Sequence, residues 1–330
     1  MMVSESFNKV CIYGVGAIGG WIGARLGAAG CHVSVLARGA TLDALQRHGL
    51  RLRENGIESA WPVQVSADPV ELGVQDLVVI AVKAPGLLDV ARRIAPLMSP
   101  DTVVLSAMNG VPWWFLQGFG GRFEGTVLKA VDVTGEIGQA IPAACVIGCV
   151  VHASCMAEPG YAQHHFGNKL IIGEPSGQQT QRVLQLAALL QAALFEVSVS
   201  EQIQKDVWYK LWGNMTVNPI SALTGATTDR ILDDDLVRGF VSNVMLEAKE
   251  IGARIGIPIE QQPEDRHAVT RKLGAFKTSM LQDYEAGKAL EIDALVTVVK
   301  ELGALTAVPT PFTDALLGLS RLQAQVRGLY

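Results

Sequence analysis

A glycine-rich turn near the start of the chain constrains the fold more than any other feature. It comprises Gly14, Val15, Gly16, Ala17, Ile18 and Gly19, and it joins a strand-like segment, 9–13, to a helical segment, 17–29. A second strand-like segment, 31–36, follows, so the pattern predicts a β-α-β unit. In this context G-x-G-x-x-G predicts a dinucleotide site, with its phosphates at the helix N-terminus. The alternative is that the glycines only tighten a helix–strand contact.

The end of the second predicted strand indicates which dinucleotide binds. Enzymes that use NAD normally carry Asp or Glu at this point, where the carboxylate holds the ribose hydroxyls. This chain has Arg38 there instead, and a guanidinium pairs well with a phosphate. We therefore predict that NADP(H) is the cofactor and that Arg38 contacts its extra phosphate. An exposed arginine without a ligand is the alternative.

The first 200 residues are predicted to form one α/β domain. Buried strands are expected at 76–82 and 102–107, each followed by a helical segment, and shorter strands at 50–53 and 59–65. The strand-rich stretch 127–173 should extend the same sheet, and a helix at 178–194 and a strand at 196–199 should complete it. The pattern predicts a doubly wound, Rossmann-type dinucleotide-binding domain with a parallel sheet over residues 1–200.

The remainder of the chain is predicted to form an all-helical C-terminal domain over residues 201–330. A chain of 330 residues is long for one hydrophobic core, which agrees with two domains. Apolar periodicity indicates helices at 203–223, 236–255, 263–286, 291–302 and 312–326.

The first of these helices carries a polar line. Lys210, Asn214 and Asn218 are spaced at four-residue steps, so on an α-helix their side chains lie within an arc of about 80°. The neighbouring residues are largely apolar, and an unpaired ammonium or amide in a cleft is costly. The pattern predicts a ligand or a protein partner for this line. The alternative is a solvated face that ends in a capping asparagine before Pro219.

Composition excludes several classes of function. A net charge of −5 and the absence of a basic run argue against nucleic-acid binding. No apolar run is long enough for a membrane helix, and the N-terminus lacks the apolar core of a signal peptide. Five cysteines without paired spacing indicate reduced thiols in a cytoplasmic protein. We expect no metal site, because strand alternation would scatter the cysteines and histidines of 145–165 over two faces.

Taken together, these motifs resemble those of the ketopantoate reductase family. The resemblance rests on the glycine turn, Arg38, the polar line, Thr278-Ser-Met-Leu-Gln-Asp283 and Glu291-Ile-Asp293, and it runs from Lys9 to about Leu319. It implies a Rossmann-type domain followed by a helical domain, with catalysis in the cleft between them. It also implies reduction of 2-dehydropantoate to (R)-pantoate with NADPH, a step of pantothenate biosynthesis.

The resemblance also assigns roles to residues of the helical part. Lys210 matches the catalytic lysine, which hydrogen-bonds the 2-keto oxygen and supplies the proton, and an ammonium there would stabilise the charge that develops in the transition state. Glu291 matches the catalytic glutamate, which orients the substrate and the lysine. Asn214 and Asn218 match asparagines of the substrate pocket, and Ser279 matches the serine that binds the substrate carboxylate.

Three further residues follow from the same resemblance. Lys83 and Asn109 match positions near the nicotinamide and the substrate, and both follow buried strands at the edge where open α/β sheets bind ligands. Taken alone, either would be a turn or cap residue. Phe276 stands where well-known members carry an asparagine that binds the substrate. An aromatic side chain there could shape the pocket for a different acid.

Three functions therefore remain open at this point. The first is an NADPH-dependent reductase of a small 2-oxo acid, with 2-dehydropantoate as the expected substrate. The second keeps the chemistry but takes another branched or aromatic 2-keto acid. The third is a sensor that binds NADP(H) without turnover, and the presence of both Lys210 and Glu291 argues against it. We also expect a homodimer that buries part of the apolar helical domain.

Overall fold

The computed structural model describes residues 7–330, which form two compact units. The first contains the described residues up to 108 together with 117–119 and 134–203. The second contains 109–116, 120–133 and 204–330. In the described part of the chain, no helix has both the length and the apolar character needed to span a membrane.

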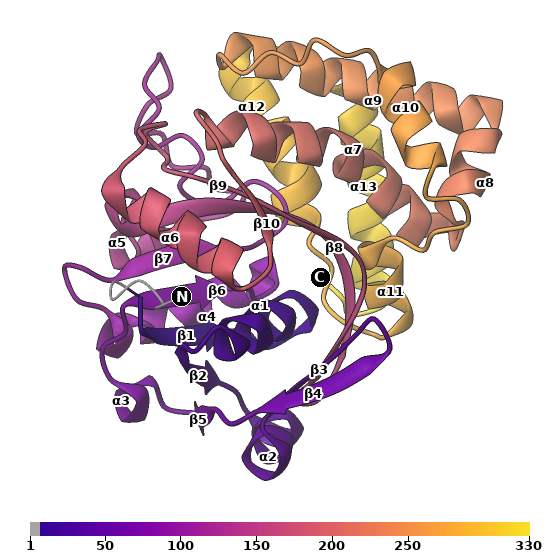
Figure 1. Ribbon diagram of the computed structural model, residues 1–330. Helices are drawn as coiled ribbons and strands as arrows, with labels where there is room; N and C mark the ends of the chain where they lie inside the picture. The colour runs from indigo at the N-terminus through magenta and orange to yellow at the C-terminus, as the bar shows by residue number, and fades with distance from the viewer. Residues whose placement is uncertain (1–6) are drawn as a thin grey trace. The chain divides into compact units, whose positions relative to one another are not determined.

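The first unit is built on one mixed sheet, in which the described residues form ten strands (Figure 1). The order is β4-β3-β9-β8-β7-β6-β1-β2-β5, and β10 pairs with β9. Pairing is parallel from β8 through β5 and antiparallel within the β3/β4 and β8/β9 hairpins. The Rossmann-type prediction is confirmed, but the sheet is parallel only in part. The strands are β1 (Lys9–Tyr13), β2 (His32–Leu36), β3 (Leu50–Glu54), β4 (Ile57–Trp61), β5 (Gln64–Ser66), β6 (Leu77–Ile80), β7 (Val103–Ser106), β8 (Val146–Glu158), β9 (Tyr161–Gly173) and β10 (Glu196–Val199).

Helices cover this sheet and close its core. Helix α1 packs against β3, β8 and β9, and α6 packs against β10. Alternate strand residues such as Val10, Ile12 and Val79 lie in one buried cluster with Trp21 of α1 and Leu186 of α6, as the period of two in a strand requires. The helices are α1 (Ala17–Ala28), α2 (Gly39–His48), α3 (Pro69–Leu72), α4 (Leu87–Arg93), α5 (Glu136–Ala140) and α6 (Gln181–Ala192), with short 3₁₀ turns η1 (Ala84–Gly86), η2 (Ala95–Leu97) and η3 (Ala143–Cys145).

Two strand predictions in the first 200 residues were wrong. Segment 59–65 is not one strand: β4 ends at Trp61, and β5 begins at Gln64 and pairs with β2. Pro62 accounts for the break, because proline has no N–H to donate to the ladder. Segment 127–145 contains turns and α5 rather than strands, and Gly135 at the start of α5 has a φ of +76°. Helix α2 was not predicted.

The helices of the second unit confirm the predicted all-helical region. Helix α9 packs against α8, α10, α12 and α13 (Figure 1). The elements are α7 (Ile203–Thr224), α8 (Thr228–Asp233), α9 (Asp235–Arg254), α10 (Pro263–Arg271), α11 (Ser279–Glu285), the π-helix η4 (Asp293–Thr297), α12 (Val298–Thr306) and α13 (Pro311–Val326).

The helix predicted at 263–286 is in fact two helices. Helix α10 ends at Arg271, and Gly274 follows with a φ of +62°, a conformation that suits glycine. The Thr278 hydroxyl then caps α11 by accepting a hydrogen bond from the Leu281 amide at 3.2 Å. Phe276 therefore lies in a connection rather than in a helix, and its carbonyl accepts a hydrogen bond from the Thr228 amide at 3.0 Å.

Candidate functional site

The glycine turn of the first unit has the geometry of a dinucleotide site. Gly14 has a φ of +100°, and a Cβ there would lie 2.6 Å from Cγ1 of Val82. A Cβ on Gly19 would overlap the Gly14 carbonyl oxygen. At Gly16, which is exposed, an added Cβ would meet no atom within 4 Å. Gly14 and Gly19 are therefore required by close packing, whereas Gly16 leaves open space at the N-terminus of α1, where a phosphate is stabilised.

The remaining residues of the turn support this shape. Val15 and Ile18 are half-buried and pack against the core of the unit. Ala17 begins α1, and Gly20 N donates the first helical hydrogen bond to Gly16 O at 2.8 Å. The backbone amides before Gly20 have no partner one turn back in the helix, so they are suited to an anionic ligand.

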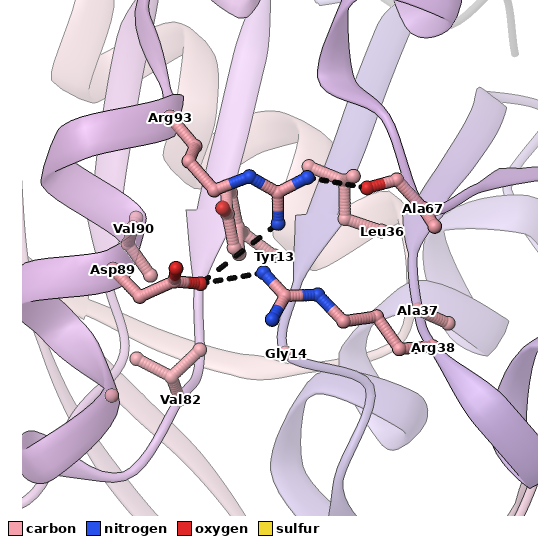
Figure 2. Close-up of a pocket in the computed structure, with 11 residues that line it drawn as sticks. Tyr13, Gly14, Leu36, Ala37, Arg38, Ala67, Val82, Asp89, Val90 and Arg93 are labelled. Atoms are coloured by element: carbon pink, nitrogen blue, oxygen red, sulfur yellow. Dashed lines mark hydrogen bonds and ion pairs between the residues drawn. The ribbon is translucent and has the colours of Figure 1, made fainter.

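A cavity of about 410 Å³ lies beside the turn. Its walls come from the ends of β1 and β2, the segment after β6, and α4, and they include Gly14 and Arg38 (Figure 2). Leu36, Val82 and Val90 give it an apolar part. The structure thus places Gly14, the first residue of the glycine turn, and Arg38 at one cavity, as the dinucleotide interpretation requires.

Charged residues at this cavity include two that sequence reasoning missed. Arg38 donates through Nη2 to Oδ2 of Asp89 at 2.6 Å, and Arg93 Nη1 lies 3.9 Å from the same oxygen. Arg93 also donates through Nη2 to the Ala67 carbonyl at 2.5 Å. Burial raises the pKa of Tyr13, which also lines the cavity. The available signal was the four-residue spacing of Asp89 and Arg93 shortly after a buried strand.

Lys83, like the predicted cofactor residues from Val15 to Gly19, is not among the residues that line the cavity. It is exposed and precedes η1, between Val82 and Gly86, which do line it. Its position after β6 agrees with the expected strand end. Its contact with the nicotinamide remains a prediction.

The polar line of the second unit lies on α7, as predicted. Lys210 and Asn214 are half-buried, and Asn218 is 6% exposed. Helix α7 continues through Pro219 to Thr224, so Asn218 neither caps the helix nor lies in solvent. The alternative of a solvated face with a capping asparagine is therefore wrong for this residue.

Lys210 and Asn109, which are 101 positions apart in the sequence, lie together. The Lys210 ammonium donates through Nζ to Oδ1 of Asn109 at 2.8 Å. The amide oxygen holds one of the three ammonium protons, so the others can reach further acceptors. Lys210 and Asn109, which were assigned to the active site from separate sequence segments, are thus hydrogen-bonded to each other.

The Asn109 loop docks on the π-helix that follows Glu291. Gly110 has a φ of +80°, and a Cβ there would lie 2.5 Å from the Ala294 carbonyl oxygen. The Val111 amide donates to that oxygen at 2.9 Å. Ala294 belongs to η4, three residues after Glu291, which is 6% exposed. π-Helices are rare in proteins overall, but those that occur are often found at functional sites. The contact between the Asn109 loop and η4 therefore indicates a candidate active site around these two segments.

Phe276 and Ser279 flank the start of α11. Phe276 is half-buried in the connection, and Ser279 is the half-buried first residue of the helix. Both therefore remain partly accessible to a ligand. Their contacts with a substrate remain predictions.

Gly110→Ala is expected to lower both the stability of the protein and kcat. The new methyl group would collide with Ala294 and hold φ in a strained region, which costs about 1–3 kcal/mol of stability. Displacement of Asn109 would misplace Lys210, so kcat should fall about 10-fold or more. Steady-state kinetics and thermal unfolding measure the two effects.

Gly121→Ala is the matched control. Gly121 has a φ of +87° in the same unit, but a Cβ there meets no atom within 4 Å. It should reproduce the backbone strain without the loss of kcat. Equal kcat values for the two variants would show that the Gly110 contact does not position Asn109.

Comparison with known proteins decides the family. The family model "Ketopantoate reductase PanE/ApbA" matches residues 10–177, and its C-terminal counterpart matches residues 202–324. The chain belongs to the ketopantoate reductase family. The predicted resemblance is thereby confirmed.

Individual ketopantoate reductases match over nearly their whole length. The 2-dehydropantoate 2-reductase of Mesorhizobium japonicum is 46% identical over 324 residues, which cover 98% of this chain and 99% of that protein. A crystal structure from Ralstonia solanacearum MolK2 that carries the ketopantoate reductase name has a TM-score of 0.95 and 57% identity, covering 98% of this chain and 100% of that one. A PanE/ApbA family ketopantoate reductase from Ralstonia eutropha JMP134 has a TM-score of 0.82 and 26% identity, covering 97% and 99%. These matches confirm the two-part fold.

Proposed function

We propose that the protein is an NADPH-dependent oxidoreductase that reduces 2-dehydropantoate to (R)-pantoate, a step of pantothenate biosynthesis. The observation that carries the proposal is the match over 98% of the chain to a 2-dehydropantoate 2-reductase. The contact between Lys210 and Asn109 supports it, since the family chemistry needs a positioned ammonium.

The cofactor fits the first unit. The turn from Gly14 to Gly19 would hold the pyrophosphate at the N-terminus of α1, and Arg38 would pair with the 2′-phosphate. When bound, the nicotinamide supplies the hydride. The open space at Gly16 and the cavity beside it support this assignment.

Lys210 would act on the ketone oxygen of the substrate. As the carbonyl carbon accepts the hydride, negative charge grows on the oxygen, and the Lys210 ammonium stabilises that charge and donates a proton. The product is an alcohol, and the lysine regains its proton from solvent. Asn109 acts as a positioning residue by holding one ammonium proton. Glu291 would orient the lysine and the substrate.

The substrate carboxylate and hydroxyl need polar partners. We assign Ser279 to the carboxylate and Asn214 and Asn218 to the rest of the acid, as the family resemblance implies. Their partial or full burial would strengthen such hydrogen bonds, because water competes less.

A panel of 2-keto acids tests the proposal. Purified protein is mixed with NADPH and each acid, oxidation is followed by absorbance, and the product configuration is determined. The highest kcat/KM is expected for 2-dehydropantoate. A higher value for another branched or aromatic acid would contradict the substrate assignment, and binding of NADPH without turnover of any acid would favour a sensor.

Phe276→Asn tests whether Phe276 shapes the substrate pocket. If the side chain lines the pocket, the amide should add a hydrogen bond to the polar acid and raise kcat/KM for 2-dehydropantoate relative to bulkier acids, by about 5-fold or more. Phe276→Leu, which stays apolar, is the control and should not give this shift. An unchanged ranking of substrates would show that Phe276 only packs.

The homodimer is a separate part of the proposal. Helix α13 exposes Leu319, Leu322 and Val326 by 60%, 60% and 78%, and their spacing puts them on one face. We propose that this face is buried against a second copy. Sedimentation should give a dimer for the wild type and a monomer for Leu322→Glu.

A cytoplasmic location also remains a prediction.

A further inference from the structure

The chain has no Asp or Glu at the end of β2, but Asp89 of α4 lies beside Arg38 there. Asp89 meets both Arg38 and Arg93 through one carboxylate oxygen, at 2.6 and 3.9 Å. We propose that Arg93 and Tyr13 complete, with Arg38, a subsite for the 2′-phosphate of NADPH, and that Asp89 competes with this phosphate for the guanidinium groups. The inference rests on the proposed function and deepens it, because it names further residues that set cofactor preference.

Arg93 is held in place for this role. Its Nη2 donates to the Ala67 carbonyl at 2.5 Å, while Nη1 faces Asp89, so the backbone fixes one end of the guanidinium (Figure 2). Its side chain is 29% exposed, compared with 60% for Arg38. A fixed and partly desolvated guanidinium loses less entropy and less water when it binds an anion.

The charges at the cavity match a phosphate better than a carboxylate. Two guanidinium groups carry two positive charges, and Asp89 neutralises one of them. A phosphate monoester carries a charge of about −1.5 to −2 near neutral pH and would neutralise both. Asp89 is 54% exposed, so its carboxylate can turn into solvent when a phosphate repels it.

Tyr13 offers a third donor. Tyr13 is 6% exposed, and its hydroxyl has no hydrogen-bond partner within the described residues. Leaving a buried hydroxyl without a partner is unfavourable, which makes it a candidate for a ligand contact. Figure 2 shows Tyr13 in the wall of the same cavity as Arg38, Asp89 and Arg93.

The test compares two probes that differ in the phosphate at issue. Adenosine 2′,5′-bisphosphate and adenosine 5′-monophosphate are titrated by calorimetry into wild type and Arg93→Ala. Loss of a charge-assisted hydrogen bond should weaken the bisphosphate about 10-fold or more. The monophosphate should change less than about 3-fold.

Arg92→Ala is the matched control. Arg92 is the preceding residue on α4, is 60% exposed, and pairs with Glu136 at 3.0 Å rather than lining the cavity. It removes the same charge from the same helix, so both probes should change by less than about 3-fold. The proposal is overturned if the ratio of the monophosphate Kd to the bisphosphate Kd is the same in Arg92→Ala and Arg93→Ala.

Two gentler changes test the other members of the subsite. Asp89→Asn removes the competing charge and should tighten the bisphosphate alone, by about 3-fold or more. Tyr13→Phe removes only the hydroxyl and should weaken it by about 2- to 10-fold. The ratio of kcat/KM for NADPH to that for NADH should move in the same directions.

The outcomes separate this inference from the proposed function. A wild type that prefers the bisphosphate and NADPH, with an Arg93→Ala variant that keeps that preference, overturns the subsite alone. A wild type that binds neither probe contradicts dinucleotide use as well. If Arg93→Ala does not fold, Arg93→Met replaces it, because methionine keeps an unbranched side chain but carries neither the charge nor a donor, and an undiminished preference for the bisphosphate again overturns the proposal.

Discussion

Lys210→Ala is expected to lower kcat and kcat/KM for 2-dehydropantoate together, by about 100-fold or more. The Lys210 ammonium would contribute mainly as charge develops on the ketone oxygen, and loss of such an interaction affects both constants equally. Cofactor binding, which fluorescence titration measures, should be retained because the glycine turn and Arg38 lie in the other unit. Steady-state kinetics with 2-dehydropantoate give the two constants.

Lys205→Ala is the control for this experiment. Lys205 is an exposed lysine on the same helix, so its loss changes the net charge equally without touching the Asn109 contact. Its kcat should stay within about 2-fold of wild type. A near-normal kcat for Lys210→Ala would rule out the catalytic role, and circular dichroism on both variants excludes unfolding as the cause of a loss.

Local sequence rules were sufficient for the parts of the site that depend on neighbours in the chain. The turn from Gly14 to Gly19 was predictable because Gly14 and Gly19 make close contacts within the turn or with the adjoining strand end, and Gly16 leaves the space that a phosphate needs. The shared face of Lys210, Asn214 and Asn218 follows from helical periodicity alone. Both features appear in the structure at the expected residues.

Contacts between distant segments were beyond the same reasoning. Nothing local relates Asp89 and Arg93 to Arg38, because their meeting depends on the crossover that brings α4 beside the end of β2. The Asn109 loop belongs to the helical unit, where Gly110 lies close to Ala294, 184 positions away in the sequence. The family resemblance predicts that Asn109 lies near the nicotinamide and the substrate, but it does not predict the hydrogen bond between Asn109 and Lys210.

Helix boundaries failed for a related reason. Apolar periodicity continues through 263–286, but the backbone breaks where Gly274 adopts a positive φ and Thr278 starts a new helix. The π-helix η4 likewise has no local signature and was predicted as an α-helix. Both errors lie beside predicted substrate residues, where local preference and global structure often disagree.

Glu291 is expected to act as one unit with Lys210. Glu291 is 6% exposed and lies two residues before η4, the element on which the loop of Asn109 docks, and Asn109 accepts a hydrogen bond from Lys210. If the carboxylate serves to orient the lysine and the substrate, Glu291→Ala should lower kcat/KM by about 100-fold, and Glu291→Gln should show how much of the loss is due to charge.

A double-mutant cycle measures the coupling. If Glu291 acts through Lys210, the variant that combines Lys210→Ala and Glu291→Ala should lose little more activity than Lys210→Ala alone, because removing the proton donor leaves the glutamate no lysine to orient. Lys300→Ala, an exposed change on α12, is the control partner and should add independently to Lys210→Ala. If the fold-loss of kcat/KM in the double variant equals the product of the two single losses, to within a factor of about 2, the two residues act separately. Glu291 would then contribute through the substrate rather than through the lysine.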